Sequence, residues 1–325
     1  MKSLAEEFEP AYLSLMRTGE LRQRVRQAYE RLEDCDLCAR YCYVNRRETI
    51  RGAVCRTGER AVVHSFGAHH GEEDPLRGRR GSGTIFFSWC NLRCAYCQNW
   101  EISWQGVGRE VEPDELAGMM LELQDRGCHN INFVSPSHVV AQILAATLIA
   151  AEAGPSTGSG RGLRLPLVYN TGGYDSPEAL ALLDGVIDIY MPDLKYGDPD
   201  IARKYSRVRD YPAINRVAVK EMHRQVGDLR LDDDGIALRG LLVRHLILPD
   251  DLAGTEAILR FLAQEISPDT YINLMAQYRP AFRAHEHPPL DRAITGDEYR
   301  QAFELADKYG LRRLDQRRAR AWIVL

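Results

Sequence analysis

The chain has 325 residues, of which 45% are hydrophobic and 27% charged, with a formal net charge of −4 and an isoelectric point near 6.2. This length allows one large domain, or a domain with an appendage, with ample apolar sequence for a core. The slight acidity gives no electrostatic footprint for nucleic acid, because Arg77, Arg79 and Arg80 form only a short basic patch.

Two features of the sequence indicate the compartment. The first ten residues lack the basic and then apolar order of a secretory signal. The apolar run over residues 139–151 is too short to span a bilayer. We therefore expect a cytoplasmic protein that does not contact membranes. Its eight cysteines then suit metal binding better than disulfides, because the cytoplasm keeps thiols reduced.

The N-terminal part combines helices with cysteines. Residues 4–33 carry apolar side chains at spacings that favour one or two helices. Four thiols follow, and together they make a closed ligand set: Cys35, Cys38, Cys42 and Cys55. A metal that links loops can order a segment with few core positions. Zinc and a second iron–sulfur cluster both fit the spacing, and four unligated thiols are the alternative.

From residue 80 onward, short apolar runs alternate with helical segments, which is typical of βα units and a mainly parallel sheet. The expected strands cover residues 84–89, 130–134, 166–170, 186–191, 241–248 and 271–275. Helices are expected at 113–127, around 143–149, and at 176–183, 201–205, 255–266 and 296–309. Six units predict a partial (β/α)6 barrel. We assign residues 80–325 to this barrel with a C-terminal extension, and residues 1–79 to the helical, metal-binding segment.

Several connecting segments depart from this pattern. Residues 154–164 are rich in Gly and Ser and predict a mobile loop. Residues 215–239 predict a helix and then a hairpin around Asp232-Asp-Asp-Gly235. Gly71-Glu-Glu-Asp-Pro75 favours a solvated loop over a substrate contact. The basic residues between 312 and 320 predict a solvated helix end, with an acidic electron donor as the alternative contact.

The clearest chemical motif is the CxxxCxxC triplet of Cys90, Cys94 and Cys97, directly after the first expected strand. Sites in parallel α/β folds form at the carboxyl ends of strands. A cubane iron–sulfur cluster that only carries electrons takes four thiolates, so three thiolates leave one iron open to another ligand. Zinc would need a further ligand such as histidine, and none lies close in sequence. The triplet therefore predicts a [4Fe-4S] cluster that takes part in chemistry.

With the aromatic Tyr96 before its last cysteine, this loop resembles that of the radical S-adenosylmethionine (SAM) enzymes. The resemblance implies that the open iron binds SAM and that a reduced cluster cleaves it to a 5′-deoxyadenosyl radical, which abstracts hydrogen from a substrate. It also places Tyr96, Gln98 and Asn99 near the adenine. A low-potential electron donor such as flavodoxin or ferredoxin is the implied partner, and no catalytic residue beyond the cluster ligands is predicted.

A second segment, Met191-Pro-Asp-Leu-Lys-Tyr196, resembles the Asp-Leu-Lys segment of the pyruvate formate-lyase activating enzymes. This implies that Asp193 and Lys195 help to hold SAM; a surface ion pair is the alternative. The cysteine segment 35–45 resembles a less characterised branch of those enzymes' relatives. A partner protein such as a glycyl radical enzyme is then the implied hydrogen donor. Radical modification of a peptide or small molecule, and a two-centre iron–sulfur electron carrier, are the alternatives.

The chain also departs from this family. The Gly-Gly-Glu segment that usually follows the second strand and holds the methionyl amine is replaced by Phe133-Val-Ser-Pro-Ser-His138. Ser135 becomes the candidate acceptor for the amine. Asn170, at the end of the third strand, is a further candidate for cofactor binding. Arg244 and His245 lie within the fifth expected strand, where charge indicates a polar barrel interior, and we expect His245 at the cofactor.

Overall fold

The computed structural model describes residues 8–153 and 162–315. Most of the loop expected at 154–164, and the basic tail after residue 315, lie outside the described residues. Within these described residues, ten strands form one sheet in the order β10-β9-β8-β6-β5-β4-β2-β1-β3, with β7 paired to β8. The edge strands β10 (Arg313–Leu314) and β3 (Arg109–Val111) do not pair with each other, so the sheet stays open.

The centre of the sheet consists of the six predicted parallel strands. They are β2 (Ser82–Phe87), β4 (Ile131–Val134), β5 (Leu167–Thr171), β6 (Ile189–Pro192), β8 (Ala237–Leu246) and β9 (Tyr271–Met275). The prediction of a partial barrel is confirmed. Strand β8 begins before the expected residue because its first part pairs with β7 (Arg230–Leu231) in the predicted hairpin.

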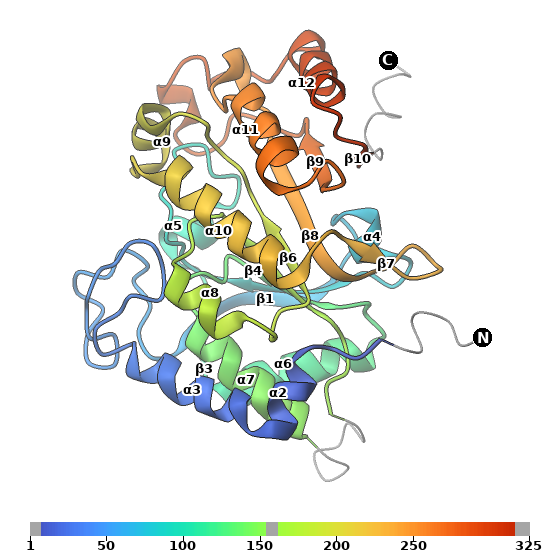
Figure 1. The fold of residues 1–325 in the computed structure, drawn as a ribbon. Coiled ribbons are helices and arrows are strands. Elements are labelled where there is room, and N and C mark those ends of the chain that lie inside the picture. The colour runs from blue at the N-terminus through green and yellow to red at the C-terminus, as the bar shows by residue number, and fades with distance from the viewer. Residues whose placement is uncertain (1–7, 154–161, 316–325) are drawn as a thin grey trace.

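Helices connect these strands and cover the outside of the sheet (Figure 1). In chain order they are α6 (Pro113–Asp125), α7 (Val140–Glu152), α8 (Pro177–Leu183), α9 (Pro199–Ser206), α10 (Tyr211–Val226), α11 (Thr255–Phe261) and α12 (Gly296–Lys308). The described residues also form two short helices, α4 (Asp74–Arg77) and α5 (Trp100–Gln105), and three further helical turns. These are the 3-10 turns η2 (Pro249–Asp251) and η4 (Ala284–Glu286) and the π-helical turn η3 (Leu262–Ile266).

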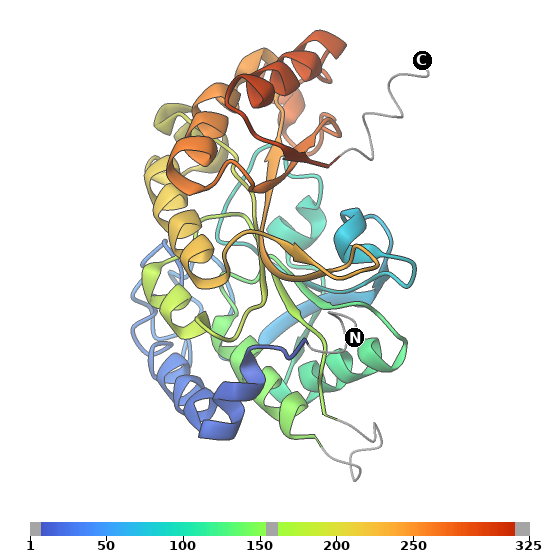
Figure 2. The same cartoon turned by 45° about the vertical axis from the view of Figure 1, so that its right-hand side comes forward.

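The N-terminal helices α2 (Tyr12–Thr18) and α3 (Glu20–Glu30) pack against α7. Figures 1 and 2 show them at one end of the molecule, with α11 and α12 at the opposite end. Local sequence signals set several helix starts. Pro113 occupies the first turn of α6 behind a capping box of Glu112 and Glu115, and the Asp198 side chain caps α9.

Strand β1 (Ala61–His69) was not predicted. It pairs antiparallel with β2 and with β3, although its residues fall within the segment assigned to residues 1–79. Its second half is largely exposed, so the alternation of apolar and polar residues that identifies a strand in sequence is weak. The N-terminal segment and the barrel therefore share one sheet.

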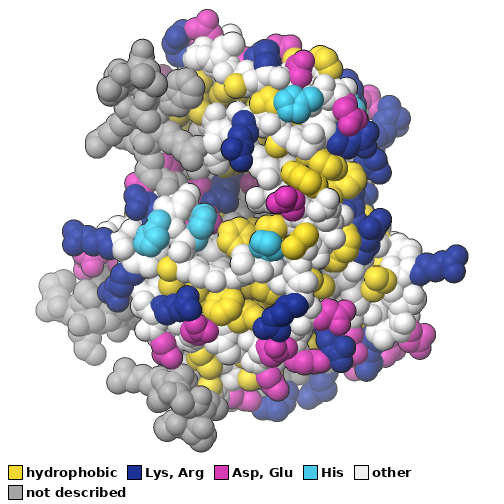
Figure 3. Space-filling model, turned by 180° about the vertical axis from the view of Figure 1, so that it is seen from behind, with side chains coloured by type: hydrophobic (Ala, Val, Ile, Leu, Met, Phe, Trp, Pro, Cys, Tyr) yellow, Lys and Arg dark blue, Asp and Glu magenta, His cyan; other side chains and the backbone are white. Residues whose placement is uncertain are grey.

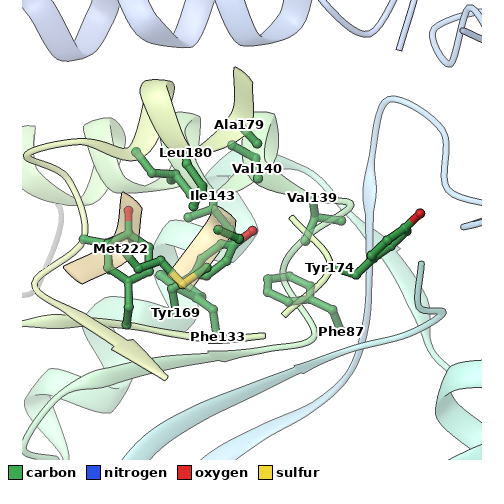
Figure 4. Close-up of a cluster of buried hydrophobic side chains, with 14 of the residues drawn as sticks. Phe87, Phe133, Val139, Val140, Ile143, Tyr169, Tyr174, Ala179, Leu180 and Met222 are labelled. Carbon is green, nitrogen blue, oxygen red and sulfur yellow. The ribbon is translucent and has the colours of Figure 1, made fainter. Parts of the chain in front are cut away.

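The core beneath the site joins the central strands to the outer helices (Figure 4). Phe87 of β2 stacks on Phe133 of β4 with ring centroids 6.2 Å apart. Tyr169 of β5 lies beside them, and Ile143 of α7 and Leu180 of α8 close the cluster from the helical side. All five side chains are buried, and each contributes about 1.5–3 kcal/mol through removal from water. This packing fixes the strand ends that carry the functional loops.

Candidate active site

A cavity of about 460 Å³ opens where the central strands end. Its wall includes all three cysteines of the triplet and most of the residues that the sequence predicted for the cofactor. Those residues are Cys90, Cys94, Cys97, Tyr96, Gln98, Asn99, Ser135, Asn170, Asp193 and Lys195. The loops after β2, β4, β5 and β6 bring them together, as expected for the carboxyl edge of a parallel sheet.

Each thiol of the triplet has a polar partner. The backbone N–H of Leu92 donates to Cys90 Sγ at 3.4 Å, and Ser206 Oγ donates to Cys94 Sγ at 2.9 Å. Cys97 Sγ lies 3.0 Å from Ser103 Oγ. Such contacts stabilise thiolates, and hydrogen bonds to sulfur tune the potential of iron–sulfur clusters. The donor set therefore fits a cluster bound through three thiolates.

Burial acts against ionisation of these thiols. It raises the pKa of Cys90 to about 12, with the neighbouring thiols Cys94 and Cys97 adding to the shift, and it also raises the pKa of Cys94. Metal binding needs thiolates and displaces their protons. Within residues 8–153 and 162–315, no three His, Cys, Asp or Glu side chains converge on one point as ligands of a single ion would. A cubane does not need such convergence, because each thiolate binds a different iron.

Asp193 and Lys195 form an ion pair in the cavity. Lys195 Nζ donates to Asp193 Oδ2 at 2.5 Å, and the side chains are only 17% and 22% exposed. Burial acts to lower the pKa of Lys195, but the Asp193 carboxylate and the Cys94 sulfur raise it well above its usual value. The pair is therefore a charged, mostly buried feature of the cavity wall.

Ser135 directly follows β4, and Asn170 lies near the end of the neighbouring strand β5. The Ser135 N–H donates to the Asn170 carbonyl at 2.9 Å. Ser135 has a φ of 59°, a left-handed conformation that is uncommon for a residue other than glycine. Backbone strain of this kind is concentrated at functional sites. Nearby, Tyr96 is buried between the rings of Tyr196 and Tyr278, at centroid distances of 6.3 and 5.9 Å.

His245 does not reach the cavity, and its expected place at the cofactor is a correction. Its ring is fully buried, with Nδ1 2.8 Å from the Leu194 carbonyl and Nε2 3.0 Å from Thr255 Oγ1 of α11. Successive residues of a strand point to opposite faces of the sheet, so Arg244 lines the cavity instead. The sequence placed both residues on one strand without indicating which of them faces inward.

The wall around Arg244 holds two carboxylates that the sequence did not predict for the site. Arg244 Nε donates to Glu73 Oε1 at 2.8 Å, and its Nη2 donates to both Glu72 and Glu73. Asn273 Nδ2 donates to Glu73 Oε1 at 2.6 Å. The two glutamates are 4% and 1% exposed, so the expectation of a solvated loop at residues 71–75 is wrong. No periodic pattern in the sequence could have shown this burial.

His69 extends this cluster to the rim of the cavity. Its Nδ1 lies 3.1 Å from Glu72 Oε1, and this contact raises the pKa of the imidazole. Burial of Glu72 would raise the pKa of the carboxyl, but Arg244 and His69 outweigh it and lower that pKa to about 2. Glu72 therefore stays ionised, and it fixes which nitrogen of His69 faces the protein.

The N-terminal cysteines surround a buried arginine. Cys35, Cys38 and Cys55 are buried, and Cys42 is half-buried. The Arg46 guanidinium, 3% exposed, donates to Cys35 Sγ at 3.4 Å and to the carbonyls of Thr57, Gly58 and His138. In the described part of the chain no carboxylate pairs with it, and the thiols of Cys35, Cys38 and Cys55 are the groups that raise its pKa against burial.

A buried cation without an anion is costly, so the cysteines around Arg46 fit best as thiolates. Burial alone favours the neutral form of Cys38, because it raises the pKa of that thiol far above its ordinary value. Thiolates that bind a metal centre keep a net negative charge, which would offset the charge of the Arg46 guanidinium. As at the triplet, the described thiols do not converge as the ligands of a single ion would. His138 Nε2 lies 3.0 Å from the Ser88 carbonyl, and burial lowers the pKa of the imidazole to about 3, so the ring is neutral.

Comparisons with known proteins agree with the triplet. Residues 84–241 match the family described as the Radical SAM superfamily. The chain is 32% identical over 289 residues to "Uncharacterized protein MJ0674" of Methanocaldococcus jannaschii, covering 86% of this chain and 76% of that protein. It is 23% identical over 283 residues to "Uncharacterized protein MJ0808" of the same organism, covering 80% and 76%.

Two solved structures show weaker likenesses. A radical SAM methyltransferase from Sphaerobacter thermophilus gives a TM-score of 0.43 at 13% identity, over 70% of this chain and 64% of that one. TYW1 with a lysine-pyruvate adduct bound gives 0.41 at 10% identity, over 69% and 73%. Among residues 8–153 and 162–315, no helix is both long and apolar enough to cross a bilayer.

Proposed function

Because this chain belongs to the radical SAM superfamily, we propose that it is an oxidoreductase that abstracts hydrogen from a substrate bound in the cavity at Cys90, Cys94 and Cys97. A [4Fe-4S] cluster on these cysteines, with SAM bound, supplies the chemistry of this family, the reductive cleavage of SAM to a 5′-deoxyadenosyl radical. The observation that carries the proposal is that, among the described residues, three thiols without a fourth share one cavity with a mostly buried Asp193–Lys195 ion pair.

The chain's own residues have distinct tasks in this proposal. Lys195 meets the carboxylate of SAM, and Asp193 holds Lys195 and accepts from hydroxyl or amine groups. Ser135 and Asn170 offer oxygen atoms to the methionyl amine in place of the missing Gly-Gly-Glu segment. Tyr96, Gln98 and Asn99 lie on the adenine side of the cavity, where Gln98 Nε2 donates to the Gln277 carbonyl at 3.1 Å.

For the substrate, we propose a partner protein whose hydrogen is abstracted, with the glycine of a glycyl radical enzyme as the first candidate. The likeness of residues 191–196 to the activating enzymes supports this. Radical modification of a peptide or small molecule is the second candidate. The wall of Arg244, Glu72 and Glu73 favours it, because buried polar groups in a cavity suit a substrate with polar groups of its own.

At the N-terminal site, we propose that Cys35, Cys38, Cys42 and Cys55 hold zinc or a second iron–sulfur cluster. Arg46 supplies the counter-charge to the thiolates. Counting iron and zinc per chain in the wild type and in Cys35→Ala separates the two: a loss of about four irons indicates a cluster, and the loss of about one zinc a structural ion. Unchanged metal content would refute the site.

Cofactor cleavage tests the enzyme proposal. Protein reconstituted without oxygen and reduced with dithionite should convert SAM to 5′-deoxyadenosine and methionine, and Cys90→Ala should abolish both products. Cys128→Ala is the matched control, because Cys128 is a buried thiol that does not line the cavity. Bound iron without SAM cleavage in the wild type would instead indicate the two-centre electron carrier.

A further inference from the structure

A second groove, of about 530 Å³, lies on the surface beside the cysteine segments. Its lining is Arg40, Ile50, Arg51, Gly52, Ala53, Val54, Arg56, Arg93 and Arg207. We call it the arginine groove, because five of its nine lining residues are arginines and none is acidic. This is an unusual concentration for a chain with a net charge of −4. On the face shown in Figure 3, acidic and basic side chains are intermixed.

The arginine groove lies where the two cysteine segments meet. Arg40 stands between Cys38 and Cys42, Val54 precedes Cys55, and Arg93 stands between Cys90 and Cys94. The two segments also hold each other. Arg40 Nε donates to the Asn91 carbonyl at 2.6 Å, and Arg93 Nη2 donates to the Val54 carbonyl. A molecule bound in the groove would therefore contact the loops that carry both sets of cysteines.

No carboxylate of the described residues offsets the positive charge of the arginine groove. Arginines close by in the sequence pair with carboxylates, as Arg31 does with Asp36 and Arg47 with Glu33. None of the five groove arginines has a carboxylate within 4.0 Å in the part of the chain that the structure describes. Charges left unpaired on a surface attract a partner of the opposite sign.

The arginines are also held in place and lie next to apolar surface. Arg56 packs over the Trp89 ring at 5.2 Å, and Arg93 and Arg207 pack over Trp104 at 5.2 and 5.4 Å. Ile50, which lines the groove, is 51% exposed. Arginine combined with exposed apolar side chains is typical of protein interfaces, whereas a site for a small anion needs charge alone.

We propose that the arginine groove is the docking surface for an acidic electron-donor protein. The inference rests on the proposed function, because SAM cleavage in this family requires a reduced cluster. One electron leaves the flavin or iron–sulfur centre of the donor, which is oxidised by one electron, and enters the metal centre bound by this chain, which is reduced by one. This step forms and breaks no covalent bond and transfers no proton.

The test compares two triple variants of the reconstituted full chain. The groove variant is R51E/R56E/R207E, and the control is R22E/R109E/R300E, which changes the net charge equally at side chains that are 58%, 62% and 66% exposed outside the groove. Binding of purified flavodoxin and of a bacterial ferredoxin is measured by interferometry at low and high salt, and thermal unfolding verifies that both variants fold.

We expect at least one donor to bind the wild type and the control, and the groove variant to bind it at least about tenfold more weakly and with less dependence on salt. Equal binding by the two variants, or no binding of either donor to the wild type, overturns the proposal. The proposal is also overturned if pyrophosphate or single-stranded RNA binds in the groove and neither donor protein does. Reduction with dithionite bypasses docking, so SAM cleavage by the wild type under dithionite tests the proposed function separately.

Discussion

At the scale of single residues, the chemistry of the cavity depends on charges that burial would neutralise if they were alone. Lys195 stays protonated because Asp193 lies 2.5 Å away, and Glu72 stays ionised because of Arg244 and His69. These pairs are kept mostly out of water, where a charge interacts more strongly with a ligand than it would at the surface. Substitutions at the Asp193–Lys195 pair should therefore change cofactor binding, and substitutions at Glu72 should change the pH dependence of stability.

Replacing Lys195 with Met should weaken the binding of SAM to the reconstituted protein by about 10- to 100-fold, because a charge-assisted hydrogen bond contributes about 1.5–3 kcal/mol. Equilibrium dialysis with labelled SAM measures this. Lys204→Met is the matched control, because Lys204 is exposed and packs on Tyr205 outside the cavity. Equal affinities of the two variants would contradict a role for Lys195 at the cofactor.

Glu72 predicts a specific dependence of stability on pH. Its pKa is about 2 in the folded chain and about 4.3 when unfolded, so the unfolded state binds more protons in acid. The stabilisation is present above the unfolded pKa and is lost as the pH falls towards the folded value. Between pH 6 and pH 3 the wild type should lose about 2 kcal/mol more unfolding free energy than Glu72→Gln.

Urea denaturation at the two pH values measures the difference. Glu110→Gln is the control, because the Glu110 side chain is 60% exposed and should give the wild-type dependence. If the unfolding free energy of Glu72→Gln depended on pH as that of the wild type does, Arg244 would not be holding the Glu72 carboxyl ionised.

At the scale of elements, the site depends on how closely β2 and β4 approach each other, because β2 leads directly into the cysteine triplet. A Cβ added to Gly83 of β2 would lie 2.5 Å from the carbonyl oxygen of Asn130, immediately before β4. Backbone cannot give way there without separating the two strands, so the glycine sets the spacing of the sheet below the triplet.

Gly83→Ala should therefore lower the free energy of unfolding by about 1–3 kcal/mol and reduce the iron retained at the triplet. The matched change is Gly118→Ala in α6, where an added Cβ meets no atom within 4 Å. That variant should be more stable by about 0.5–1 kcal/mol, because alanine favours the helix. Calorimetry and iron counts measure both. If Gly83→Ala left both the free energy of unfolding and the iron content unchanged, the two strands could separate without affecting the site.

At the scale of the whole molecule, the N-terminal segment is tied to the barrel at three places. Strand β1 pairs with β2, α3 packs against α7, and Arg40 and Arg93 link the two cysteine segments. We expect a single cooperative thermal transition, and we expect Cys35→Ala to shift all of it to lower temperature. Calorimetry with circular dichroism measures this. Two separate transitions would instead indicate that residues 1–79 fold independently of the barrel.

Much of this architecture was predictable because its signals are local. Six strands and their helices followed from the apolar pattern, and the spacing of Cys90, Cys94 and Cys97 indicated a cluster site at a strand end. The pair Asp193 and Lys195 was found by resemblance, and the cavity contains both. Ligand spacing and strand ends are properties of a few consecutive residues, which do not depend on what the rest of the chain does.

The tertiary structure alone decided the remaining features. Arg244 faces the cavity and His245 faces α11, although they are consecutive residues of one strand. Glu72 is buried because it pairs with Arg244, which is 172 residues away in sequence. Arg46 lies among cysteines that come both before and after it in the sequence. Sequence by itself determined the six central strands with their helices, and where three thiols stand together. Which charges are buried, and with which partners, depends on contacts between distant segments, because an ionised side chain leaves water only where folding brings it a counter-charge.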